Sequence, residues 1–245
     1  MRTVLLTTET THHAYFAREV GRRFPLAGIL VETRAARAPF ETAHPYERER
    51  DEYEREVLLA GLAGGLSYLA PSRSFETANE ARAVEWLVSL RPDVAIVFGT
   101  GRLEAAATSA PGIACLNLHG GDPERYRGLD THLWAIYHGE FDALVTTLHH
   151  VDPGLDTGDV VFRTGLVLGP GTRLAEFRAI NTRACVDLAL LALAGLDAGI
   201  ALPRMRQARR GRYYSFMPAA LKNRVATNFE RHVARLGSRS PGSPA

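Results

Sequence analysis

The chain has 245 residues, with 29 basic and 27 acidic side chains and a formal net charge of +2. With 46% apolar and 23% charged residues it has an ordinary globular composition, so its overall charge gives no reason to expect binding to nucleic acid or membranes. There is no signal peptide, no apolar run of the roughly 20 residues that a membrane span needs, and no C-x-x-C pair. We therefore expect a cytoplasmic protein without a bound metal.

The first half of the chain alternates apolar strands with amphipathic helices. Predicted strands lie at 3–8, 26–33, 93–101 and 113–119, and predicted helices at 12–24, 45–63 and 78–90. This order is typical of βαβ units and a parallel sheet. The strands lack a regular alternation of apolar and polar residues, which fits strands that helices cover on both faces. We therefore predict an α/β, Rossmann-like fold with a mostly parallel twisted sheet.

The pattern changes in the second half. A predicted helix at 128–140 precedes strands at 143–151 and 159–168, which a turn-rich loop joins, so they should form an antiparallel pair. The longest predicted helix covers 172–196. Its expected apolar stripe consists of Leu174, Phe177, Ile180, Ala184, Leu188 and Leu191.

The end of the chain should form a short extension. Residues 211–218 are predicted to be strand or turn, and a helix of about 15 residues should follow them. Residues 237–245 are small, polar and rich in Pro and Gly, which predicts disorder. The expected organisation is a catalytic domain at 1–200, an extension at 201–236 that packs on the core or on a partner subunit, and a tail at 237–245.

Two loops at the ends of predicted strands carry the most distinctive chemistry. Ligands of parallel α/β sheets collect outside the carboxyl ends of the strands. That rule places FGTG (98–101) and NLHGG (117–121) at the same rim. Asn117 and His119 are two residues apart on a strand, so their side chains can face one reacting centre. Asp156 follows in the loop DPGLDTGD.

These three residue types suit acyl transfer to an amine. The reaction needs a hydrogen-bond donor for the developing oxyanion and a group that takes and returns a proton. It also needs a third group that controls the protonation state of this proton carrier. An asparagine amide, a histidine and a carboxylate can fill those roles in that order. Asparagine and aspartate are equally common turn residues, and a lone histidine is often structural, so the three residues alone leave both interpretations open.

The wider sequence resembles the folate-dependent formyltransferase family. That family includes glycinamide ribonucleotide formyltransferase, methionyl-tRNA formyltransferase and the sugar N-formyltransferases. The similar strings are LNLHGGDPERYRGLDTHLWAIYHGE and TTLHHVDPGLDTGDVV. The matching positions are Asn117, His119, Tyr126-Arg127-Gly128 and Leu155-Asp156-Thr157-Gly158. The resemblance is firm over 93–168 and extends over 1–200.

The resemblance implies a role for each matching residue. Asn117 would polarise the formyl oxygen, His119 would assist proton transfer, and Asp156 would act on His119 and on an ordered water. The implied cofactor is 10-formyltetrahydrofolate, with binding residues Phe98, Gly99, Thr100, Gly101, Arg102, Leu103, Asp152, Gly154 and Leu155. The implied substrate-binding residues are Gly120, Gly121, Asp122, Tyr126, Arg127 and His149. The spacing of His149 by itself favours a structural role.

Two departures from the family pattern bear on the amine acceptor. The loop after His119 reads Gly-Gly-Asp-Pro, where Pro-Ser-Leu-Leu-Pro is common in the family. The first loop (7–17) is not a glycine-rich loop that could hold a phosphate group, and this second departure disfavours glycinamide ribonucleotide as the substrate. Only a short segment follows the long helix, so full tRNA recognition is not expected. The deformylase branch of the family carries an N-terminal regulatory domain, and because this chain begins with the first strand we do not expect it to belong to that branch. These features favour a small amine, above all a nucleotide-linked amino sugar, with Arg127 and Arg204–Arg212 as candidates for its phosphates.

Other interpretations remain open at this point. The chain could be a 10-formyltetrahydrofolate hydrolase, an enzyme similar to glycinamide ribonucleotide formyltransferase, or a non-catalytic Rossmann-like binding module. The segment at 211–225 could cover an edge of its own sheet or pair with a second subunit, so a homodimer is possible.

Overall fold

A seven-stranded sheet with the strand order β3-β2-β1-β4-β5-β7-β8 is the centre of the computed structural model, which describes residues 1–34, 36–59 and 65–238. The five strands β1 (Thr3–Thr7), β2 (Leu26–Glu32), β3 (Ser72–Phe75), β4 (Val94–Phe98) and β5 (Ala114–His119) are parallel. β7 (Val145–His150) is antiparallel to β5 and to β8 (Val160–Gly165). The predicted α/β fold, with a mostly parallel sheet and an antiparallel pair, is confirmed.

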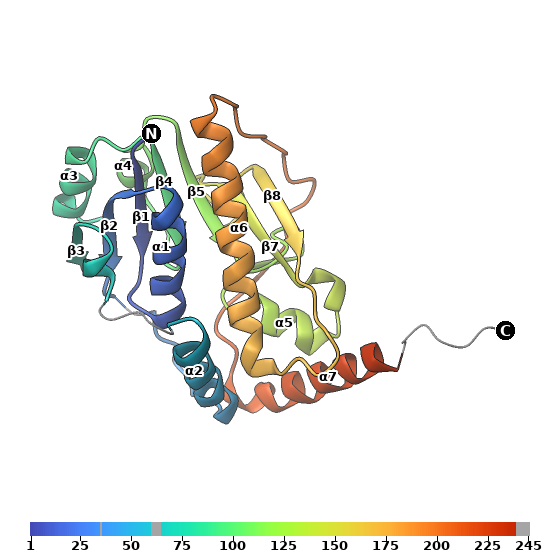
Figure 1. Cartoon of the computed structure of the whole chain (residues 1–245). Coiled ribbons are helices and arrows are strands. Elements are labelled where there is room, and N and C mark those ends of the chain that lie inside the picture. Colours follow the sequence, from blue (N-terminus) through green and yellow to red (C-terminus); the bar gives the residue numbers. More distant parts are fainter. Residues whose placement is uncertain (35, 60–64, 239–245) are drawn as a thin grey trace.

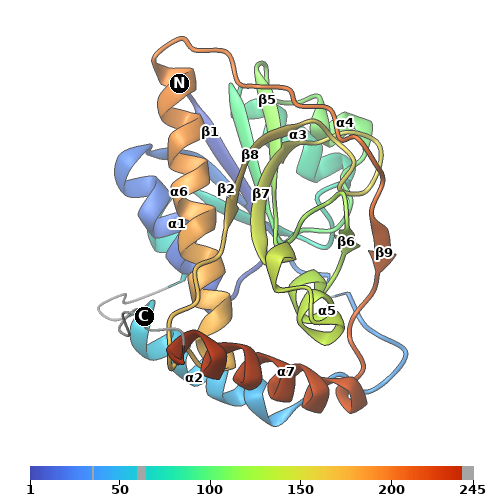
Figure 2. The same ribbon diagram turned by 90° about the vertical axis from the view of Figure 1, so that its right-hand side faces the viewer.

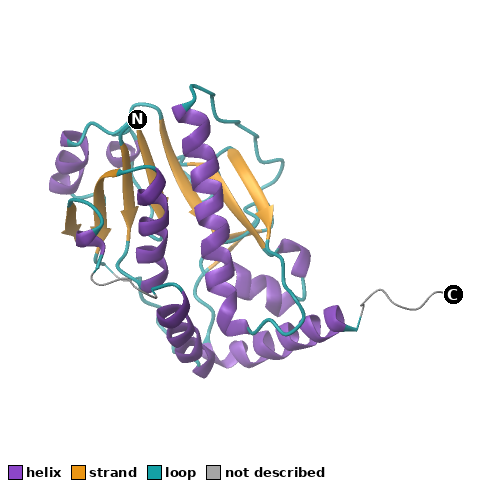
Figure 3. Cartoon of the chain, viewed as in Figure 1, coloured by secondary structure: helices purple, strands orange, loops and turns teal. Residues whose placement is uncertain are grey.

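Helices cover both faces of this sheet (Figures 1 and 3). One core layer packs α1 (Thr11–Arg23) and α6 (Phe177–Asp197) against the strands through residues such as Phe16 and Cys185. The other packs α3 (Ala81–Ser89) and the short α4 (Ala105–Thr108) through Leu87 and Ala107. Every residue of β1 and β4 is buried, as the lack of alternation in their sequences indicated.

The longest helix differs from its prediction. It begins at Phe177 after the 3-10 turn η3 (Leu174–Glu176), and Leu191 of the expected stripe is 55% exposed. The buried stripe is offset and includes small residues such as Cys185 and Ala189, which allow the helix to lie close to the sheet. Leu174–Asp197 is long and apolar enough to cross a membrane, but half of it is buried in the core, as expected for a core helix.

Two short strands form a second sheet that sequence periodicity did not predict. β6 (Tyr126–Gly128) pairs in parallel with β9 (Arg212–Tyr214), beside α5 (Thr131–His138) (Figure 2). Gly128 has φ 96°, and a Cβ at this position would lie 2.1 Å from a main-chain carbonyl oxygen of β9. Only glycine fits here, because the two strands approach so closely.

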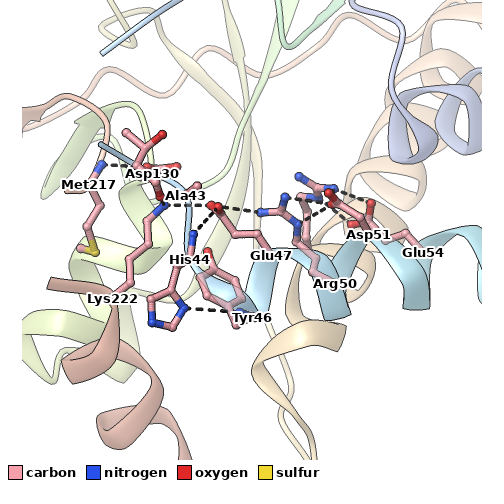
Figure 4. A network of polar contacts seen from close by, with 12 residues as sticks. Ala43, His44, Tyr46, Glu47, Arg50, Asp51, Glu54, Asp130, Met217 and Lys222 are labelled. Atoms are coloured by element: carbon pink, nitrogen blue, oxygen red, sulfur yellow. Dashed lines mark hydrogen bonds and ion pairs between the residues drawn. The ribbon is translucent and has the colours of Figure 1, made fainter. Parts of the chain in front are cut away.

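The last helix, α7 (Ala219–Gly237), packs against α5 in a third apolar cluster. It is also tied to α2 (Pro45–Val57) through Lys222, which is 1% exposed and donates to the carbonyl oxygen of Thr42 and to Glu47 Oε1 at 2.8 Å (Figure 4). Gly237 is the last residue of this helix, and 239–245 of the predicted disordered tail lie outside the described residues, as do 60–63 of the predicted helix at 45–63.

Candidate active site

The three residues predicted to be catalytic meet at one carboxylate oxygen. Asn117 and His119 lie at the end of β5, and Asp156 lies in the loop between β7 and β8. Asp156 Oδ1 is 3.4 Å from Asn117 Nδ2 and 3.6 Å from His119 Nδ1. The His119 and Asp156 side chains are 5% and 7% exposed. The sheet therefore assembles an amide, an imidazole and a carboxylate in a largely buried cluster.

His149 is a fourth member of this cluster. It is directly opposite Asn117 in the pairing of β5 with β7. Its Nε2 atom is 3.1 Å from Asn117 Nδ2 and 3.6 Å from Asp156 Oδ1. The resemblance implied that His149 binds substrate, whereas its spacing alone favoured a structural role, because the spacing does not show which residue His149 faces across the sheet. The register between the two strands is the signal that would have found it.

Hydrogen bonds to main-chain carbonyl groups fix the tautomers of both histidines. His149 Nδ1 is 2.8 Å from the carbonyl oxygen of His150, which can only accept, so the neutral ring carries its proton on Nδ1 and accepts from Asn117 at Nε2. His119 Nε2 is 2.9 Å from the carbonyl oxygen of Tyr126, so the neutral ring carries its proton there. The free nitrogen of His119 is therefore Nδ1, the one that faces Asp156.

Asp156 is a carboxylate at neutral pH. Burial alone would raise its pKa, but the facing imidazoles of His119 and His149 and the hydrogen bond from the Gly128 N–H at 2.8 Å outweigh that effect and hold the pKa well below its usual range. Its φ of 54° is in the left-handed region, which aspartate tolerates better than most residues. A protonated His119 would therefore face a fixed negative charge.

The loop that carries Asp156 is tightly built. A Cβ on Gly158 would lie 1.7 Å from the carbonyl oxygen of His150, so the Gly of the LDTG motif permits a close backbone approach. Asp152 accepts from Thr157 Oγ1 at 2.7 Å and from the Gly154 N–H at 3.1 Å. Asp152, predicted to bind cofactor, thus has its carboxylate engaged within the turn.

The two segments predicted to bind the cofactor lie next to each other. Arg102 Nη2 donates to the carbonyl oxygen of Pro153 and thereby ties 98–103 to 152–158. Gly99, Gly101 and Arg102 are exposed residues of the first of these segments. The side chains of Phe98 and Leu103 are packed in the core and are 7% and 4% exposed, and their role in binding the cofactor stays a prediction. These two residues can offer only main-chain groups to a ligand.

The remaining residues that are predicted to bind the cofactor belong to the same two segments. Thr100 and Leu155 are both half-buried, and Thr100 Oγ1 donates to the carbonyl oxygen of Gly101 at 3.2 Å. The Gly101 N–H donates to Glu32 Oε1 at 2.7 Å, which fixes the direction of the exposed segment.

The Gly-Gly-Asp loop is held more firmly than its composition suggests. The carbonyl oxygens of Gly120 and Gly121 accept from the hydroxyl groups of Thr131 and Thr147. Gly121 is buried, and a Cβ there would lie 3.0 Å from His119 Nε2. Asp122 forms an ion pair with Arg163 at 2.7 Å. Its carboxylate is therefore engaged, and the loop packs behind His119.

Tyr126 and Arg127 point to opposite sides of β6. Arg127 is 7% exposed and donates from Nη1 to the carbonyl oxygen of Leu155 at 2.9 Å and from Nε to that of Gly211 at 2.8 Å. It holds the Asp156 loop and does not present its charge to solvent. Tyr126 donates from its hydroxyl group to Glu140 at 2.8 Å and lines an open groove on the other side.

That groove, here called the arginine groove, has a volume of about 530 Å³. It is lined by Glu124, Arg125, Tyr126, His138, Glu140, Asp142, Arg209, Arg210, Gly211, Arg212 and Tyr214. Arg125 is paired with two of its acidic residues, and Arg163 pairs with the third. The side chains of Arg209, Arg210 and Arg212 are exposed and form no ion pair within the described part of the chain. The groove therefore has uncompensated positive charge.

A comparison with known proteins gives a family match. A family model described as "Formyl transferase" matches residues 31–174. A methionyl-tRNA formyltransferase from Solibacter usitatus is 31% identical over 149 residues, which are 60% of this chain and 46% of that protein. The chain spans about half the length of the curated relatives it matches.

Solved structures show the same fold at low sequence identity. A sugar N-formyltransferase from a Shewanella species is 13% identical, covers 88% of this chain and 77% of its own, and has a TM-score of 0.57. HypX from Aquifex aeolicus, solved in complex with tetrahydrofolic acid, is 14% identical, covers 99% of this chain and 35% of its own, and has a TM-score of 0.60.

Proposed function

This chain belongs to the formyl transferase family, and we propose that it moves the formyl group of 10-formyltetrahydrofolate to the primary amine of a small substrate. The observation that carries this proposal is the cluster of Asn117, His119 and His149 around the single charged carboxylate of Asp156. The finer part of the proposal is that the amine belongs to a nucleotide-linked amino sugar.

Asn117 supplies the donor for the formyl oxygen. One N–H of its amide is directed to His149 at 3.1 Å, and the other makes a longer contact of 3.4 Å with Asp156. The longer contact is the weaker, so an incoming carbonyl oxygen can replace Asp156 as the acceptor. The amide is already oriented by His149, and donors fixed in advance stabilise developing negative charge with little reorganisation.

His119 and Asp156 manage the proton. In the overall reaction a bond forms between the amine nitrogen and the formyl carbon, the bond from that carbon to the donor nitrogen breaks, and one proton moves from the amine to the donor nitrogen. His119 Nδ1 is free to take this proton and return it, because Nε2 is bound to a carbonyl group. The carboxylate at 3.6 Å stabilises the imidazolium ion in between.

The residues at the junction of 98–103 and 152–158 fit the formyl donor. Gly99, Gly101 and Arg102 are exposed, and Arg102 ties their segment to Pro153 in 152–158, the segment that also carries the half-buried Leu155. When bound, the folate supplies a formyl group attached to a nitrogen that can leave. The chain's part is to hold the donor through backbone groups and direct its formyl group toward Asn117.

The arginine groove supports the proposal that the acceptor carries phosphate groups. Arg209, Arg210 and Arg212 provide uncompensated charge next to the half-buried ring of Tyr214, which stacks on the buried ring of Tyr126. Guanidinium groups bind phosphate oxygens well, and aromatic rings can stack with a base. The arginine groove adjoins the catalytic cluster, because Tyr126 lines the groove and its carbonyl oxygen accepts from His119 Nε2. A cytoplasmic location and a homodimer stay predictions.

A second candidate acceptor is methionyl-tRNA. The curated relatives at about 30% identity carry the name methionyl-tRNA formyltransferase, although this chain spans about half of their length. Positive charge in the arginine groove is compatible with a tRNA acceptor end as well as with a sugar nucleotide.

One experiment separates these possibilities. The protein is incubated with 10-formyltetrahydrofolate and, in separate reactions, a panel of nucleotide-linked amino sugars, methionyl-tRNA, or no amine. We expect an increase in mass of one formyl group on an amino sugar. Replacing the three groove arginines with alanine should then raise the KM for that sugar nucleotide and leave kcat nearly unchanged. Equal consumption of the donor without any amine would show a hydrolase.

A further inference from the structure

The loop that carries Asp156 is held by residues that follow the matched region of the chain. The family match ends at residue 174, yet Gln207 donates from Nε2 to the carbonyl oxygens of Asp156 at 3.0 Å and Gly158 at 2.8 Å. We propose that Gln207 is a positioning residue that fixes Asp156 relative to His119 and His149. This inference rests on the proposed function, since it concerns the same carboxylate.

The segment that carries Gln207 is itself anchored along the loop. Met205 and Val160 exchange two main-chain hydrogen bonds, of 3.0 and 2.8 Å, at the start of β8. His150 Nε2 is 3.3 Å from the carbonyl oxygen of Pro203. Gln207 follows these anchors and is half-buried. Its amide is therefore presented from a fixed backbone, with both N–H groups directed at the loop.

The carbonyl groups around Asp156 need such donors. Arg127 donates to Leu155, and Gln207 donates to Asp156 and Gly158, so three carbonyl oxygens of the loop each accept from a side chain. Asp156 is in the left-handed region at φ 54°, a conformation that persists only where the surrounding structure holds it. Without Gln207, two of these carbonyl groups lose their partner and the backbone is free to relax.

A small relaxation would matter for the chemistry. Asp156 Oδ1 contacts Asn117 at 3.4 Å and both histidines at 3.6 Å. A displacement of about 1 Å from productive geometry can lower a rate by about 100-fold. Gln207 touches neither the amide nor the imidazoles, so its effect would pass entirely through the backbone of Asp156.

Asn228 provides a matched control. Its Nδ2 atom also donates to two main-chain carbonyl oxygens, those of Ile136 at 3.0 Å and Tyr137 at 3.1 Å, where α7 meets the end of α5. Asn228→Leu removes the same kind of double contact far along the chain from the Asp156 loop. A purely structural effect would be similar in both variants, whereas a positioning effect belongs to Gln207 alone.

The test compares Gln207→Met, which keeps the size of the side chain and removes its donors, with Asn228→Leu in the full chain. We expect Gln207→Met to lower kcat by about 10- to 100-fold with little change in KM, and to shift the pH dependence of kcat/KM. Asn228→Leu should lower the melting temperature and leave kcat and the pH profile unchanged. Similar kinetic losses in both variants, or none in Gln207→Met, would overturn the proposal.

A second readout does not need an amine acceptor. The imidazole ¹⁵N resonances of His119 and His149 report the nearby carboxylate in the free protein. They should move in Gln207→Met and stay in place in Asn228→Leu. Unmoved resonances in Gln207→Met would contradict positioning even if no formyl transfer is found. Moved resonances in a protein that transfers no formyl group would instead contradict the proposed function alone.

Discussion

Replacing Asp156 with asparagine tests how far the site depends on one buried negative charge. Asparagine tolerates the left-handed conformation, and its side-chain oxygen can still accept the Gly128 N–H that Asp156 accepts at 2.8 Å, so the loop should keep its shape. The change removes a charge 3.6 Å from His119 Nδ1. At an effective dielectric constant of about 20, unit charges at that separation attract by about 4–5 kcal/mol.

Loss of this attraction disfavours the imidazolium form of His119 while the proton is in transit. We expect kcat to fall by about 100- to 10,000-fold, the usual contribution of acid–base catalysis, with little change in KM. The assay follows formyl transfer by mass, and the melting temperature of the variant checks that it is folded.

Asp159→Asn is the control, because that carboxylate lies on the same loop but is partly exposed and contacts Arg204 at 3.8 Å. Its kcat should match the wild type. The reasoning is refuted if folded Asp156→Asn retains more than about a tenth of the wild-type kcat, or if Asp159→Asn is damaged equally.

Three further predictions concern stability. Gly158→Ala should lower the melting temperature and activity, because the new methyl group would lie 1.7 Å from a carbonyl oxygen, whereas Gly165→Ala, with open space around it, should resemble the wild type. Equal melting temperatures would contradict this. Burial, with a smaller effect of Arg178, lowers the pKa of His13 from 6.5 to about 3. As the pH falls, His13 therefore takes up a proton in the unfolded chain before it does so in the folded protein, and the stability of the fold decreases between pH 6.5 and pH 3. Between pH 8 and pH 5 the wild type should lose about 2 kcal/mol more than His13→Asn in urea titrations, and parallel losses would disprove it. Glu47→Gln should destabilise by about 3 kcal/mol, since it leaves the buried ammonium group of Lys222 without its carboxylate, and Lys222→Met should cost less because the Glu47 side chain is 24% exposed. A larger loss of stability in Lys222→Met than in Glu47→Gln, measured by urea titration, would be evidence against this account.

The sequence contained enough information for the parts of the fold that have local periodicity. The buried runs of β1 and β4 and the helices between them were readable because their patterns extend over several residues. The spacing of Asn117 and His119 placed both side chains on one side of β5, where the structure has them near Asp156.

Long-range pairing explains most of what the sequence did not reveal. β6 and β9 have three residues each, too few for a periodic pattern, and their partners are far apart in the chain. The proposed role of His149 depends on the β5–β7 register, and the proposed role of Gln207 depends on a segment that returns after α6. Side-chain direction mattered as well, since Leu103 occupies a predicted ligand segment but points into the core.

The most direct measurement of the central claim is the rate at which an acceptor amine gains one formyl group from 10-formyltetrahydrofolate, compared between the wild type and Asn117→Ala. Asn117 is the donor for the developing oxyanion in this account, so the variant should transfer at least about 100-fold more slowly while it still binds tetrahydrofolate and remains folded. Equal rates in the two proteins, or donor consumption that does not depend on the amine, would contradict the assignment of this cluster as a formyl-transfer site.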